Sequence, residues 1–179
     1  EYFGGLLGDW IFRKEAFPLA EDNTEAFFQR YFPNNNDLKL YVHKKKREIP
    51  VFIENLIRQY HLIEYDIVGF TSRFQQQMAA LAMANHLKQL NPIICTILGG
   101  PNCEPPAGAA LAKQLGQIDY VFSGRRFLIG FGKFIDYYET GQFENILKIP
   151  GVFSTKSKFQ EQEIDPFIMS EEDDINEHI

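Results

Sequence analysis

Cysteine is scarce in this sequence and long apolar segments are missing, and each absence excludes a class of protein. Only two cysteines, Cys95 and Cys103, occur in 179 residues. That number is too small for a disulfide scaffold, a four-cysteine zinc site or a three-cysteine iron–sulfur site. No apolar run approaches the roughly 18 residues that a membrane-spanning helix needs, and no signal peptide is evident. We therefore expect a cytoplasmic protein that does not enter a membrane.

Catalytic and cofactor-binding signatures are also missing. The sequence has no G-x-G-x-x-G fingerprint of a nicotinamide or flavin dinucleotide site and no Walker-type phosphate loop. Its histidines (His43, His61, His86 and His178) do not cluster, and no pair has the spacing of zinc ligands on a helix. No nucleophile is expected beside a base in the folded chain. We therefore expect no independent catalysis.

The sequence has little clustered positive charge. The net charge is −6, which disfavours a general nucleic-acid surface, so we expect no nucleic-acid partner. Residues 44–47 (Lys-Lys-Lys-Arg) form the basic cluster. Four consecutive charges fit a solvated turn better than a phosphate-binding patch.

The sequence does contain an alternation of apolar strands and helices. We expect the strands at residues 67–70, 93–98, 118–122 and 152–155, with helices between them. Such an alternation is typical of a parallel α/β sheet, and right-handed crossovers place helices on both of its faces. We predict a Rossmann-like (flavodoxin-like) α/β fold with a parallel sheet and helices on both of its faces.

The segments outside this core differ in character. Residues 1–17 are rich in aromatic residues and glycine and are expected to lie against another surface. A helix with an apolar stripe is expected from Pro50, a residue that suits the first turn of a helix, to about His61. Near its end the chain is polar and acidic. We predict one α/β domain over residues 1–156 and an acidic linker or tail over residues 157–179.

The loop after the first strand carries candidate ligand-binding residues. Ligands of open α/β folds lie at the carboxyl ends of the strands. Thr71 and Ser72 offer hydroxyl groups and amides there, with Ser72 as a helix N-cap and Gln75 completing a capping box. A cap that serves only the helix explains these residues equally well. Arg73 fits a ligand phosphate or ring, or else a surface ion pair.

The loop after the second strand offers a closer approach to the backbone. Gly99 and Gly100 have no Cβ atoms, so a ligand can approach the backbone closely at the point where that strand ends. A plain turn that needs positive φ explains the pair equally well. Cys103 either faces a ligand or is a buried, inert thiol.

Several motifs together resemble a known family. They are residues 66–71 (Asp-Ile-Val-Gly-Phe-Thr), Phe74-Gln75, residues 99–104 (Gly-Gly-Pro-Asn-Cys-Glu) and residues 118–124 (Ile-Asp-Tyr-Val-Phe-Ser-Gly). The chain resembles the cobalamin-binding domain of radical S-adenosylmethionine (SAM) enzymes. The most similar subgroup comprises the maturases of ribosomally made peptides (RiPPs), many of which are C-methyltransferases.

The resemblance implies a binding edge and a set of binding residues. In such domains the corrin lies across the carboxyl ends of the strands, and the nucleotide tail runs beside the sheet near the glycine pair. The residues implied to border the tail or the lower corrin face are Thr71, Ser72, Arg73 and Gln75. Those implied on the other side of the tail are Gly99, Gly100, Asn102 and Cys103, and those at the rim are Ser123 and Gly124.

The chain also departs from the pattern of that family, whose opening strand and loop are expected upstream of Glu1. None of its histidines fits the Asp-x-His-x-x-Gly motif that supplies a cobalt ligand in many cobalamin domains, a motif that the peptide maturases often lack too. Arg125-Arg126 stands where an acidic Glu-Gly-Glu-like run is usual. The Cys-x-x-x-Cys-x-x-Cys motif of the radical domain is missing, so SAM and a 4Fe-4S cluster are expected only in a domain that this chain lacks.

Two hypotheses of different classes follow. In the first, the chain is the cobalamin-binding module of a radical SAM peptide methyltransferase and holds methylcobalamin. Its partners are then a radical SAM catalytic domain or protein and a peptide substrate. In the second, it is a degenerate, cofactor-free scaffold whose aromatic N-terminal segment holds a partner domain or peptide, which Arg125-Arg126 favour. A receiver-like signalling domain is the weakest alternative, because no acidic cluster follows the first strand.

Overall fold

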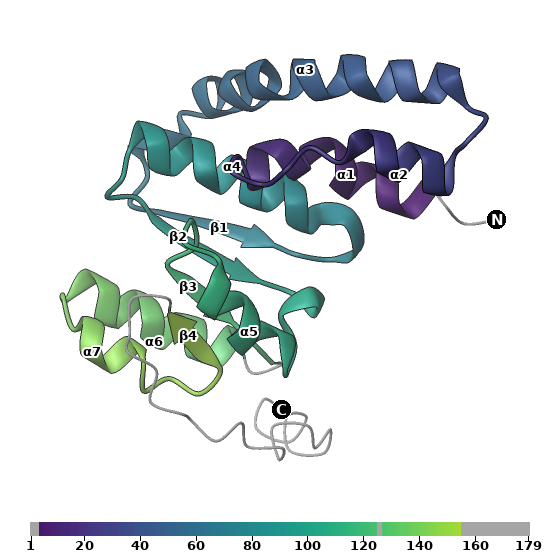
Figure 1. Ribbon diagram of the computed structural model, residues 1–179. Helices are drawn as coiled ribbons and strands as arrows, with labels where there is room; N and C mark the ends of the chain where they lie inside the picture. Colours follow the sequence, from purple (N-terminus) through teal and green to yellow (C-terminus); the bar gives the residue numbers. More distant parts are fainter. Residues whose placement is uncertain (1–3, 125–126, 155–179) are drawn as a thin grey trace, which may run out of the picture. The chain divides into compact units, whose positions relative to one another are not determined.

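The computed structural model describes residues 4–124 and 127–154 and confirms the predicted α/β class (Figure 1). Four strands are hydrogen-bonded in the order β1–β2–β3–β4, and the sheet is mostly parallel. Strands that follow one another in the sequence are also neighbours in the sheet. The predicted tail at residues 157–179 and the Arg125-Arg126 pair lie outside the described residues.

The chain divides into two compact units by its internal packing. The first comprises residues 1–96 and the second residues 97–179. The boundary lies within strand β2 (Cys95–Gly99).

The first unit is mainly helical. It contains α1 (Gly4–Ala16), α2 (Thr24–Tyr31), α3 (Asn36–Gln59), η1 (Leu62–Glu64), β1 (Ile67–Thr71), η2 (Phe74–Gln76) and α4 (Gln77–Leu90). Helix α4 ends just before Asn91-Pro92, because a residue that precedes proline disfavours helical geometry. No helix within the described ranges combines the length and the apolar character that crossing a bilayer requires.

Helix α3 is longer than the sequence predicts. It runs through Pro50, which the sequence places in the first turn of a separate helix. Proline removes one backbone hydrogen bond from a helix interior. However, Val42, Ile49, Ile53 and Ile57 form a buried stripe on both sides of Pro50. Burial of this stripe stabilises the continuous helix, because helices in proteins depend more on packing than on intrinsic propensity.

The basic cluster at residues 44–47 lies within α3 and is not the turn that the sequence predicts. Lys45 Nζ lies 2.8 Å from a carboxylate oxygen of Glu48, and Lys46 Nζ lies 3.3 Å from one of Asp22. Two of its four positive charges are therefore paired within the first unit.

Helix α1, which lies in the aromatic N-terminal segment, packs inside the first unit. Helix α1 lies along α4 (Figure 1). The amide Nδ2 of Asn85 in α4 donates hydrogen bonds to the carbonyl oxygens of Glu15 and Ala16, at 2.8 and 2.7 Å. Carbonyls in the last turn of a helix have no partners within that helix. Asn85 therefore fixes the C-terminal end of α1 on α4, and a hydrogen bond between His86 Nε2 and Glu15 Oε2 at 2.9 Å reinforces the contact.

We expect Asn85→Ala to lower the free energy of unfolding by about 1–3 kcal/mol, because two part-buried carbonyls lose their shared donor. Urea unfolding followed by circular dichroism measures this change. Asn55→Ala is the matched control, since Asn55 is an exposed residue within α3 and its replacement brings the same gain in helix propensity. Equal stability of the two variants would show that the Asn85 bonds do not hold α1 in place.

The second unit contains the rest of the sheet and its helices. After β2 come η3 (Pro101–Cys103), α5 (Ala107–Gln114), β3 (Tyr120–Phe122), α6 (Phe127–Glu139), α7 (Phe143–Ile146) and β4 (Val152–Ser154). Strands β2 and β3 are parallel, with Ile97 opposite Tyr120 and Leu98 opposite Val121. Their carboxyl ends therefore lie at the same edge of the sheet.

Strand β4 corrects the prediction of a parallel sheet, because it pairs antiparallel with β3, with Phe122 opposite Val152. The reason is the path by which the chain returns. Helix α6 is followed by α7 and then by a turn that ends at Gly151, whose φ is +79°. The carbonyl oxygen of Gly151 accepts the N–H of Ser123 at 2.8 Å. Strand β4 thus starts beside the carboxyl end of β3 and runs back along it.

Candidate functional site

The predicted site residues of the first unit follow β1. Thr71 is exposed at the end of the strand, whereas the Ser72 side chain is buried. Ser72 is not the N-cap that the sequence predicts, because a 3₁₀ turn intervenes and α4 begins only at Gln77. Instead, a carboxylate oxygen of Asp9 in α1 accepts the N–H of Met78 at 3.2 Å. An acidic group at this position is favourable because the first N–H groups of a helix lack internal partners.

Arg73 and Gln75 contact their own unit. The Arg73 guanidinium lies 4.9 Å from the centre of the exposed Phe74 ring, and within the described part of the chain it has no carboxylate partner, so the alternative of a surface ion pair is not found. The Gln75 carboxamide lies over Gly8 of α1, and a Cβ atom at Gly8 would come within 2.7 Å of Gln75 Oε1. Gln75 thus uses the open backbone of α1, although it remains exposed.

The loop after β2 is a tight turn with accessible backbone. Gly100 is exposed and has φ +105°, a conformation that favours glycine, so the turn interpretation of the pair applies to this residue. The N–H of Cys103 donates to the carbonyl of Gly100 at 2.8 Å. Gly99 and Asn102 are half-buried. A Cβ atom at Gly99 would lie 3.6 Å from Phe122 Cβ, an ordinary van der Waals distance.

Of the two alternatives for Cys103, the structure shows the buried thiol. It is 0% exposed, and burial raises the pKa of its thiol to about 11. The group is therefore protonated at neutral pH, and a thiol without its thiolate form is a poor nucleophile or ligand. Cys103 can contribute to a binding edge only by shaping the loop.

Ser123 is enclosed by its own unit. A Cβ atom at Gly108 in α5 would lie 2.6 Å from Ser123 Oγ and 2.3 Å from the carbonyl oxygen of Cys103. A Cβ atom at Gly151 would lie 2.3 Å from the carbonyl oxygen of Ser123. The structure thus brings Cys103 and Ser123 together around Gly108. Ser123 Oγ is shielded from solvent and has no hydrogen-bond partner within the described part of the chain.

Seven of the ten implied residues are at least partly accessible to solvent. In the second unit, the edge presents the backbone of Gly99, Gly100 and Gly124 and the side chain of Asn102, with no bulky side chain among them. In the first unit, Thr71, Arg73 and Gln75 are exposed. The buried side chains of Ser72, Cys103 and Ser123 cannot touch a ligand in this structure, so three of the ten implied residues would act only through their backbone or by shaping the loops.

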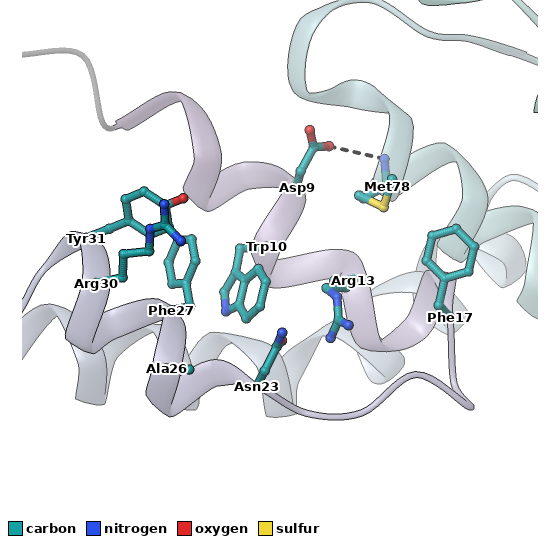
Figure 2. A pocket seen from close by; sticks show the side chains of 10 residues that line it. All are labelled: Asp9, Trp10, Arg13, Phe17, Asn23, Ala26, Phe27, Arg30, Tyr31 and Met78. Carbon is teal, nitrogen blue, oxygen red and sulfur yellow. Dashed lines mark hydrogen bonds between the residues drawn. The ribbon is translucent and has the colours of Figure 1, made fainter. Parts of the chain in front are cut away.

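The first unit also contains a cavity that the sequence does not predict. This pocket has a volume of about 590 Å³ and is lined by residues of α1, α2, the Asn23 N-cap, Phe17 and Met78 of α4 (Figure 2). Its walls include Trp10, Phe27 and Tyr31 together with Arg13 and Arg30. The aromatic richness of residues 1–17 was a signal for packing there, but nothing in the sequence pattern connects the two arginines.

No group of three or more histidine, cysteine or acidic side chains that could hold a metal ion occurs within residues 4–124 and 127–154. Comparisons with profiles of protein families, with curated proteins and with solved structures found no match for this chain.

Proposed function

We propose that the chain is the cobalamin-binding module of a radical SAM methyltransferase system that modifies peptides in the cytoplasm. The observation that supports this proposal best is the edge formed by β2 and β3. Their parallel pairing puts the Gly99-Gly100 loop and the Ser123-Gly124 turn at the same end of the sheet. Three glycines there leave backbone accessible to a flat ligand.

In this role the chain's residues hold and shield the cofactor. Bound methylcobalamin would supply a transferable methyl group, and the chemistry belongs to the cofactor and to a separate radical domain. Gly99, Gly100 and Gly124 allow close approach of the nucleotide tail, while Asn102 offers hydrogen-bonding groups. No side chain is required as a ligand of cobalt.

The test is retention of the corrin. We expect purified protein mixed with hydroxocobalamin and then desalted to keep the visible absorbance of about one equivalent of corrin, because a site of this kind releases its ligand slowly. The spectrum of the desalted protein measures the ratio. A colourless protein after desalting contradicts the proposal and leaves the cofactor-free alternative.

The second candidate is a cofactor-free protein of the same fold that binds a partner or peptide. The enclosure of Ser123 by Gly108 and Gly151 favours it, because the rim at the end of β3 is already occupied by the chain itself. The pocket beside Trp10 gives this candidate a place to bind.

A further inference from the structure

A pocket in the first unit combines aromatic walls with unpaired positive charge. It is formed by α1, α2 and the start of α4, and its volume is about 590 Å³. Pockets of about 300–1,000 Å³ are the usual size for small organic ligands and short peptide segments. Figure 2 shows the Trp10 ring standing between Phe27 and the Arg13 guanidinium.

The aromatic part is rigidly built. The Trp10 and Phe27 rings are stacked with their centres 4.2 Å apart and an angle of 6° between their planes. Tyr31 packs against Phe27 with a centre-to-centre distance of 5.1 Å. Phe27 is buried, so this wall is anchored in the core of the first unit and does not depend on a ligand for its position.

The two arginines are held by rings and not by carboxylates. Arg13 lies 5.2 Å from the centre of the Trp10 ring, and one of its N–H groups donates to the carbonyl of Glu21 at 2.8 Å. Arg30 lies 5.5 Å from the centre of the Tyr31 ring. Neither forms an ion pair within the described residues. A guanidinium group has five N–H donors in a plane that matches a carboxylate.

The one acidic side chain in the wall is already committed. Asp9 accepts the N–H of Met78 at the start of α4, and Figure 2 shows its carboxylate directed there. Among the described residues, the pocket therefore has two cationic groups without acidic partners, and its charge is complementary to an anion. Several lysines outside the pocket wall have acidic partners instead, as Lys39 does with Glu25 and Lys45 with Glu48.

The outer wall is open to solvent. Asn23, Ala26 and Arg30 line the pocket and are all exposed. An extended chain can therefore enter from this side without any helix moving. Figure 2 shows Arg13 beside Trp10 and Arg30 beside Tyr31, so two separate carboxylates suit the two guanidinium groups better than one compact phosphate does.

We propose that this pocket binds a short peptide segment that carries an aromatic side chain beside acidic residues. The aromatic side chain lies against the Trp10–Phe27–Tyr31 wall, and the carboxylates pair with Arg13 and Arg30. This site does not depend on cobalamin binding, and its residues are not among those implied for the corrin.

The probe is the peptide acetyl-Glu-Phe-Glu-amide. Trp10 is the only tryptophan of the chain, so its fluorescence reports on this pocket directly. We expect saturable fluorescence change with acetyl-Glu-Phe-Glu-amide. The dissociation constant should be about tenfold higher for acetyl-Gln-Phe-Gln-amide, since charge-assisted bonds to both arginines are lost. An ionic strength of about 0.5 M should weaken the binding of the acidic peptide more than that of the glutamine peptide.

Arg30→Gln is the decisive variant, because Arg30 is exposed and its replacement leaves the core intact. It should raise the dissociation constant of the acidic peptide about threefold, because one of the two charge-assisted interactions is lost, and leave that of the glutamine peptide unchanged. Arg58→Gln, at an exposed position in the last turn of α3, is the matched control. Both variants should retain hydroxocobalamin as the unaltered protein does, which separates this proposal from that of cofactor binding.

Several results would overturn the proposal. The first is the absence of a fluorescence change at about 5 mM peptide, a concentration at which even weak complexes form. The second is equal binding of the acidic and the neutral peptide. The third is an equal effect of the two arginine variants on the binding of the acidic peptide. Tighter binding of free 3-phenylpropionate would assign the pocket to a small aromatic acid, and tighter binding of adenosine monophosphate would assign it to a nucleotide.

Discussion

Gly99→Leu is expected to reduce cobalamin retention from about one equivalent to background while the protein stays folded. The leucine would fill the edge at the end of β2 along which the nucleotide tail is proposed to run, and close approach to a backbone requires that no side chain intervene. Visible spectra after desalting measure the loss, and circular dichroism verifies the fold.

The structure indicates that the backbone at Gly99 accepts a side chain without a clash at its Cβ atom. A Cβ atom at Gly99 would have only ordinary contacts, 3.6 Å to Phe122 Cβ and 3.8 Å to the Phe122 carbonyl oxygen. The φ of Gly99 also lies outside the left-handed region, unlike that of Gly100. Replacing Gly100 would strain the turn itself and would not discriminate between the two causes.

Two controls complete the experiment. Gly99→Ala adds a single methyl group with ordinary contacts and should keep most of the retained corrin. Gly116→Leu adds a full side chain where a Cβ atom meets no heavy atom within 4 Å, at the amino end of β3, and should behave like the unaltered protein. Retention of about one equivalent by Gly99→Leu would place the nucleotide tail elsewhere, even if the chain does bind cobalamin.

Local pattern predicted much of the fold because it depends on short-range periodicity. The apolar run at residues 67–70 became β1, and Asn91-Pro92 ended α4 at Leu90. The direction of β4 was not predictable, because it depends on where α6 and α7 return the chain. The predicted N-cap of α4 was wrong for a similar reason. Asp9, which is distant in the sequence, accepts the hydrogen bond from the first turn of α4 that Ser72 was expected to accept.

The candidate site shows the same division. The glycine pair and its possible need for positive φ could be predicted from the sequence, and Gly100 has that conformation. The enclosure of Ser123 could not, because Gly108 and Gly151 approach it from two other elements. The pocket beside Trp10 could not be predicted either, since Arg13 and Arg30 line one cavity only because Trp10 of α1 stacks on Phe27 of α2.

The stability of the second unit should depend strongly on the Phe134 side chain in its core. This side chain is 0% exposed, and its ring centre lies 5.2 Å from those of both Tyr120 and Phe122 of β3, in edge-to-face arrangements. Phe131 and Tyr138 pack on it from the same helix, α6. Phe134 thus joins α6 to the strand that precedes the Ser123-Gly124 turn.

Phe134→Ala is expected to lower the free energy of unfolding by about 3–5 kcal/mol, because it removes buried apolar surface and leaves a cavity that its rigid neighbours cannot fill. Urea unfolding followed by circular dichroism measures the change. Phe143→Ala is the matched control: Phe143 is 52% exposed and contacts the Tyr138 ring at 5.7 Å, so it should cost about 1 kcal/mol or less. A loss at Phe134 no larger than that at Phe143 would mean that α6 does not pack on β3 in solution. Since the turn after β3 depends on this packing, the variant should also lose cobalamin if the edge beside Gly99 binds it.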